Sequence, residues 1–200
     1  MEPVTGTIGG ILAAFGLSGA AGLNAWLPLL AVGVGDRAGW LALDAPYDLL
    51  SSTPGLGLVG LLFVLDLIGD KIPALDSVLH LIGLVIAPAS GALLFAAQTD
   101  ATSDLNPAVG VVLGALTAGG LQAGRAAVRP FVTASTAGIG NPAVSAAEDG
   151  TSALLTLLAF LVPVLAFLLV LIVLGLIVWL VLRARRRMSG RRATRSEFGP

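Results

Sequence analysis

The sequence contains no cysteine, a single histidine and few charged residues. Only 12% of its 200 residues are Asp, Glu, Lys or Arg, against about a quarter in a typical soluble domain. Without cysteine the chain has no disulfide, thiolate zinc site or thiol nucleophile, and His80 alone cannot form a multi-histidine metal site. These shortages exclude a soluble enzyme, a nucleic-acid binder and a disordered chain. We expect no enzymatic activity and no cofactor.

Long apolar segments are what the sequence has in abundance. Hydrophobic residues make up 56% of the chain, and its mean hydropathy is +0.95. A helix needs about 20 apolar residues to cross a bilayer. We therefore predict an all-α, polytopic membrane helical bundle, with one transmembrane domain over residues 1–186 and a disordered, Arg-rich tail over 187–200. Five segments carry no Asp, Glu, Lys or Arg: 3–35, 49–65, 77–99, 105–124 and 150–182.

Prolines indicate where the membrane helices begin. Proline is favoured in the first turn of a helix, and Ser, Thr or Asn often caps the helix just before it. Asn106-Pro107 and Asn141-Pro142 fit this pattern, and Pro163 is placed to open a helix after a tight turn. The segment 150–182 also fits one long helix kinked at that proline. We favour two, which gives six helices at about 6–35, 54–70, 73–97, 107–128, 142–162 and 163–186.

The distribution of charge predicts the topology. Residues 183–200 carry a net charge of +6, whereas residues 1–182 carry −7. Basic residues that flank a membrane helix stay in the cytoplasm, so we expect the C-terminus there, close to anionic lipid head groups. Six helices place both termini in the cytoplasm of a bacterial inner membrane, together with Lys71, Arg125 and Arg129. Five helices would move these three residues outside.

Glycine spacing and a weak internal repeat bear on packing and architecture. Glycines three or four residues apart, such as Gly16, Gly19 and Gly22, let helix backbones approach closely in lipid, within a compact bundle or a homo-oligomer. The segments 22–25 and 120–123 are similar to each other. They suggest two three-helix halves of opposite orientation, a 3+3 inverted repeat typical of secondary transporters.

The densest polar cluster follows the second predicted helix. Asp66 and Asp70 are four residues apart, as are Asp76 and His80 on the next helix, and a turn at Pro73 would bring the two pairs together. Ionisable side chains in membrane helices suggest an ion or proton pathway. The structural alternative is that Asp76 stabilises the positive end of its helix. Asp66 is harder to explain in this way, because it lies about one turn inside the membrane edge.

Glu148 and Asp149 form a second acidic cluster, near the start of the fifth predicted helix. Arg125 and Arg129, at the end of the fourth, are the closest basic residues in the expected topology. An unpaired buried charge costs several kcal/mol, so we expect ion pairs between the two helices. Structural pairing is favoured over direct contact with a substrate, and a gate built from such pairs would serve both purposes.

Asn24 is the third candidate. Pro28 removes the hydrogen bond that the carbonyl of Asn24 would otherwise accept inside a helix. A polar side chain and a free carbonyl would then coincide near the middle of the first predicted helix. Broken helices of this kind bind ions or polar solutes in several transporters. The structural alternative, slightly favoured, is a hydrogen bond from Asn24 to a neighbouring helix.

Several of these residues also carry a family resemblance. The runs 16–28, 70–77 and 135–149, which include Asn24-Ala25-Trp26-Leu27-Pro28 and Glu148-Asp149, resemble a bacterial inner-membrane family catalogued only as a domain of unknown function, of the four-one-two-six type. The resemblance covers about residues 10–165. It implies a small integral membrane protein, and it brings no known substrate, cofactor or catalytic residue.

Two functions remain open from the sequence. The first is a small transporter or channel for a cation or small solute. The alternative is a membrane protein that transports nothing, such as a scaffold, a lipid-interacting protein or a subunit of a complex. A transporter should show a polar cavity that reaches Asn24 or Asp66, whereas a scaffold should pack these residues dry.

Overall fold

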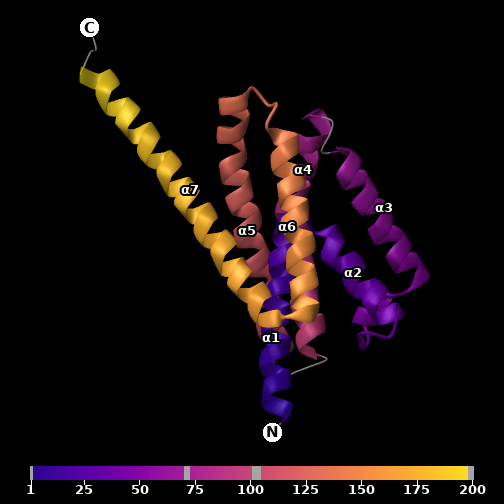
Figure 1. Ribbon diagram of the computed structural model, residues 1–200. Coiled ribbons are helices and arrows are strands. Elements are labelled where there is room, and N and C mark those ends of the chain that lie inside the picture. The colour runs from indigo at the N-terminus through magenta and orange to yellow at the C-terminus, as the bar shows by residue number, and fades with distance from the viewer. Residues whose placement is uncertain (1, 70–72, 101–104, 198–200) are drawn as a thin grey trace.

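The chain forms a bundle of long helices in the computed structural model shown in Figure 1. The structure describes residues 2–69, 73–100 and 105–197, and the side chains of residues 6–69, 81–100 and 105–183. All regular structure in these residues is helical. The elements are α1 (Glu2–Leu23), α2 (Trp26–Arg37), the 3-10 helix η1 (Tyr47–Leu50), α3 (Thr53–Gly69), α4 (Pro73–Asp100), α5 (Pro107–Thr136), α6 (Asn141–Leu161) and α7 (Pro163–Glu197).

Five helices of the described chain are long and apolar enough to cross a membrane, and the 17-residue α3 is a shorter apolar helix. Only 11% of the apolar part of α7 is buried within the protein, so most of this helix is apolar surface of the kind that a membrane-spanning helix presents. The protein is a polytopic membrane helical bundle, as the composition predicts. The five segments are Gly6–Leu23, Leu81–Asp100, Pro107–Thr136, Asn141–Leu161 and Pro163–Arg183.

Helix starts follow the proline pattern. The side chain of Asn106 caps α5 by accepting a hydrogen bond from the backbone N–H of Ala108 at 2.9 Å. α6 ends at Leu161 and α7 begins at Pro163, with Val162 between them in a non-helical conformation. The prediction of two helices here is confirmed, and the alternative of one kinked helix is wrong.

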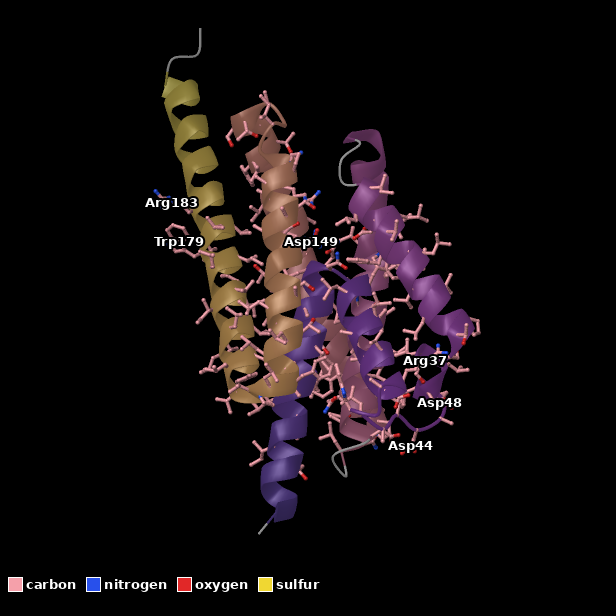
Figure 2. All side chains as sticks on the ribbon, turned by 45° about the vertical axis from the view of Figure 1, so that its right-hand side comes forward. Arg37, Asp44, Asp48, Asp149, Trp179 and Arg183 are labelled. Carbon is pink, nitrogen blue, oxygen red and sulfur yellow. The ribbon has the colours of Figure 1, made fainter. Side chains whose placement is uncertain are left out.

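The first predicted helix, 6–35, is wrong as a single element. α1 ends at Leu23 and α2 begins at Trp26. Figures 1 and 2 both show α1 rising through the bundle to this break and α2 turning back, so that the two helices form a V. As a result, the start of α1 and the end of α7 lie at opposite ends of the bundle (Figure 1). Six full crossings would have brought them to the same end.

α1 lies at the centre of the bundle and packs against α4, α5, α6 and α7. Its glycines allow these close contacts, as their spacing predicts. A Cβ at Gly16 would lie 2.7 Å from the Cβ of Ala166, and one at Gly22 would lie 2.6 Å from the carbonyl oxygen of Ala118. Contacts this short leave no room for a larger residue. The last turn of α1 is therefore held tightly against α5.

The two segments matched in the repeat meet at this contact. A Cβ at Gly22 would lie 2.7 Å from the Cβ of Leu121, so residues 22–25 lie beside residues 120–123. The segments differ in one respect, because α1 breaks at Asn24 whereas α5 continues through Gln122. The 3+3 inverted repeat itself stays a prediction.

Candidate functional site

The site is built around the break between α1 and α2. The side-chain oxygen of Asn24 accepts hydrogen bonds from the backbone N–H groups of Trp26 at 3.0 Å and Leu27 at 3.1 Å. These are donors that the first turn of a helix leaves without partners. Pro28 falls within the first turn of α2, where it costs no hydrogen bond. The predicted interruption is present, and a new helix capped by Asn24 replaces the expected kink.

The amide nitrogen of Asn24 links two acidic residues from different helices. It donates to Oδ1 of Asp149 on α6 at 2.8 Å and to Oδ2 of Asp66 on α3 at 3.3 Å. Because both oxygens bind one nitrogen, they lie within about 6 Å of each other. Asn24 is only 4% exposed. The break therefore brings together two carboxylates that are 83 positions apart in the sequence.

The carbonyl groups at the end of α1 also have partners. A guanidinium N–H of Arg125 donates to the carbonyl oxygen of Leu23. The single hydroxyl proton of Ser152 is donated mainly to the carbonyl oxygen of Ala20 at 2.9 Å, and the carbonyl oxygen of Asn24 lies at 3.4 Å from the same hydroxyl. Buried carbonyls of a broken helix need such donors. α5 and α6 thus stabilise the break from two sides.

Arg125 and Arg129 pair with Glu148, as the sequence predicts. Nη2 of Arg125 lies 2.6 Å from Oε2 of Glu148, and Nη2 of Arg129 lies 3.0 Å from the same oxygen. The three side chains are 11–13% exposed. One carboxylate therefore forms ion pairs with two guanidinium groups. The Nε atom of Arg125 is buried without a hydrogen bond in the described structure.

A cavity of about 50 Å³ adjoins this network, which is room for about three or four water molecules. Asn24 from the break and Asp66 from α3 both line this cavity, together with residues of α4 and α5. Its lining residues are Ala21, Leu23, Asn24, Ala25, Trp26, Asp66, Ile82, Gly83, Ile86, Ala87, Gln122, Arg125 and Arg129.

The site lies beside the apolar part of α7. Figure 2 shows Asp149 at about the height of Trp179 and Arg183, where the apolar part of α7 ends. Asn24 lies between α1 and α2, because the predicted helix 6–35 is two helices, and its depth in the membrane stays a prediction.

The candidate residues from the sequence divide into two groups. Asn24, Asp66 and Asp149 converge, and Glu148 joins the same network through Arg125 and Arg129. Asp70 and the side chains of Asp76 and His80 lie outside the described residues. In the part of the chain with described side chains, no three His, Cys, Asp or Glu residues are grouped as metal ligands.

Sequence reasoning missed two members of the site, Gln122 and Ser152. Gln122 is 2% exposed and lines the cavity, and Ser152 is fully buried beside the break. A signal for Gln122 was present, because it is the one amide in the sequence of α5 and lies in the segment matched to Asn24. Ser152 carries no comparable signal among the other small residues of its helix.

Comparison with known protein families identifies the family of this chain. The family model for the Domain of unknown function (DUF4126) matches residues 11–183, which extend from α1 to the last apolar turns of α7. No curated protein and no solved structure matches the chain. The match contains the break, both bridged carboxylates and the Arg–Glu network. Because it covers most of the sequence, the chain belongs to the DUF4126 family.

Proposed function

We propose that the protein is a small membrane transporter or channel in which the carboxylates bridged by Asn24 take up and release protons. The observation that carries this proposal is the cavity, which reaches both Asn24 and Asp66. A scaffold has no need for room for water beside its buried polar residues. Ionisable side chains beside such a space, at membrane depth, are typical of proton and ion pathways.

The geometry favours a proton over a metal cation. Hard cations such as Ca²⁺ need six or more oxygen ligands, whereas the amide nitrogen of Asn24 occupies the space between the carboxylates of Asp66 and Asp149. That nitrogen is fixed, because the oxygen of the same amide holds the start of α2. A proton binds a carboxylate oxygen without moving the amide, and it relieves the repulsion between two nearby negative charges.

Removing the acid at the cavity wall should stop proton movement. We expect Asp66→Asn to lower the proton flux of purified protein in liposomes to the level of empty liposomes, because an amide of the same size does not ionise and so cannot carry a proton as a carboxylate does. The flux is measured with a pH-sensitive dye inside the vesicles under an imposed pH gradient.

The matched control is Asp48→Asn, which makes the same chemical change at an exposed residue of η1 (Figure 2). It should conduct like the unmodified protein. Equal flux through the Asp66→Asn variant would remove Asp66 from the pathway. No flux above background in the unmodified protein would favour the alternative of a membrane scaffold.

We also propose a bacterial inner membrane location, with the Arg-rich end of α7 in the cytoplasm. Arg183 lies over the ring of Trp179, 4.9 Å from its centre, and Trp and Arg are typical of the membrane–water boundary. Asp44 and Asp48 lie at the opposite end of the bundle (Figure 2). The start of α1 then faces outward, and the Arg-rich end contacts anionic lipid head groups. A homo-oligomer stays a prediction.

A further inference from the structure

α5 lines one side of the cavity with Gln122, Arg125 and Arg129, whose side chains offer more hydrogen-bond donors than acceptors. Gln122 is 2% exposed, and its side-chain oxygen accepts a hydrogen bond from Arg125 at 3.1 Å. The nitrogen of the same amide makes no hydrogen bond within the described structure. It faces Gly83, another residue of the wall, where a Cβ would lie only 2.7 Å away. Because Gln122 lines the cavity, this nitrogen is a donor that a group bound in the cavity can use.

Arg125 adds further donors to the same wall. A guanidinium has five N–H groups in a planar fork that matches a carboxylate. Arg125 and Arg129 share one oxygen of Glu148, and Arg125 itself lines the cavity. The group that best satisfies the free amide of Gln122 and this guanidinium together is a second carboxylate.

We propose that the cavity binds a small monocarboxylate, held by the amide nitrogen of Gln122 and the guanidinium of Arg125. In the bound state this carboxylate takes over contacts that Glu148 now makes. Ile82, Ile86 and Ala87 supply an apolar wall against which a short aliphatic tail packs. The volume, about that of three or four waters, suits an acid of about four heavy atoms such as acetate.

This inference rests on the proposed function, because it names a solute that binds in the cavity beside the proton-binding carboxylates. Around the cavity the described charged side chains are Asp66, Asp149, Glu148, Arg125 and Arg129. With all of them ionised, their net charge is −1. A second negative charge in this partly buried cluster is unfavourable unless a carboxylate is neutralised. Loss of the charge at Asp66 should therefore strengthen the binding of the acid.

The test is calorimetric titration of the purified full-length protein in detergent with sodium acetate, at constant pH and ionic strength, with sodium chloride and sodium octanoate as comparison ligands. We expect saturable binding of acetate, and none of chloride. Octanoate should not bind, because its chain exceeds the cavity. Tight octanoate binding with no acetate binding would indicate a lipid-derived acid and overturn the proposal.

Three variants and a control make the test specific. Gln122→Leu should weaken acetate binding about tenfold, because one buried hydrogen bond to a charged group is lost. Gly83→Ala should abolish it by filling the space beside Gln122. Asp66→Asn should strengthen it several-fold. Gly175→Ala is the matched control for Gly83→Ala, because a Cβ there meets no atom within 4 Å, and its affinity should not change.

The directions of these effects separate binding from folding. A general loss of folded protein cannot both weaken binding in Gln122→Leu and strengthen it in Asp66→Asn. Absence of saturable acetate binding, or unchanged affinity in Gln122→Leu and Gly83→Ala, overturns the proposal. Proton flux without acetate binding would leave the proposed function standing and remove this inference. Acetate binding without proton flux would support the acetate site and contradict the proposed proton pathway.

Discussion

Replacing Glu148 by alanine is expected to lower the free energy of unfolding by about 3–5 kcal/mol. The change leaves Arg125 and Arg129 nearly buried without the carboxylate that both of them bind. A guanidinium group cannot lose its proton to escape this cost. The loss should be visible in chemical unfolding of the purified protein in detergent, followed by circular dichroism.

Two further variants show whether the buried pairing is the cause. Glu148→Gln keeps an oxygen that accepts hydrogen bonds, so it should cost less than alanine. Asp48→Ala removes an exposed carboxylate of η1 and should cost less than about 1 kcal/mol, as for other exposed charges. If Glu148→Ala were no more destabilising than Asp48→Ala, the Arg–Glu network would contribute nothing to the fold.

The second large effect is expected at Asn24. Asn24→Ala removes the cap of α2, which should cost about 1–2 kcal/mol. It also removes the amide that separates the carboxylates of Asp66 and Asp149, so the total loss should exceed that of a cap alone. Hydrogen exchange at the amides of Trp26 and Leu27 should accelerate, because their shared acceptor is gone.

Asn24→Ser separates the two contributions. Serine is a good capping residue, so it should restore slow exchange at Trp26 and Leu27 while the two carboxylates stay without their common donor. Its stability should lie between those of the alanine variant and the unmodified protein. Slow exchange in Asn24→Ala would show that the side chain of Asn24 does not hold the break.

Local signals in the sequence predicted much of the fold. Asn106-Pro107 and Pro163 mark helix starts through capping and backbone constraint, which act within one turn. Gly16 and Gly22 indicated close packing, because only small residues let backbones approach. The pairing of Arg125 and Arg129 with Glu148 followed from the cost of leaving charges unpaired across two neighbouring helices.

Long-range geometry was harder to predict. The segment 6–35 carries no charged residue, so it is predicted as one crossing, and only the cap by Asn24 and the packing of α2 show that the chain turns back. That turn decides which end of the bundle the start of α1 occupies. It also brings Asp66 to Asn24, because α3 reaches the break only through α2 and the segment between them.

The central claim is that the space beside the broken helix opens to water. Because the chain has no cysteine, an Ala87→Cys variant places a single thiol at the wall of the cavity, and Ala14→Cys places one at a fully buried position away from it. Reaction of membrane-embedded protein with a small, charged, water-soluble thiol reagent tests access. We predict labelling of the Ala87→Cys variant, slowed by acetate, and no labelling of the Ala14→Cys variant. Equal absence of labelling in both would mean that Asn24 and Asp66 are packed dry, and would contradict the account.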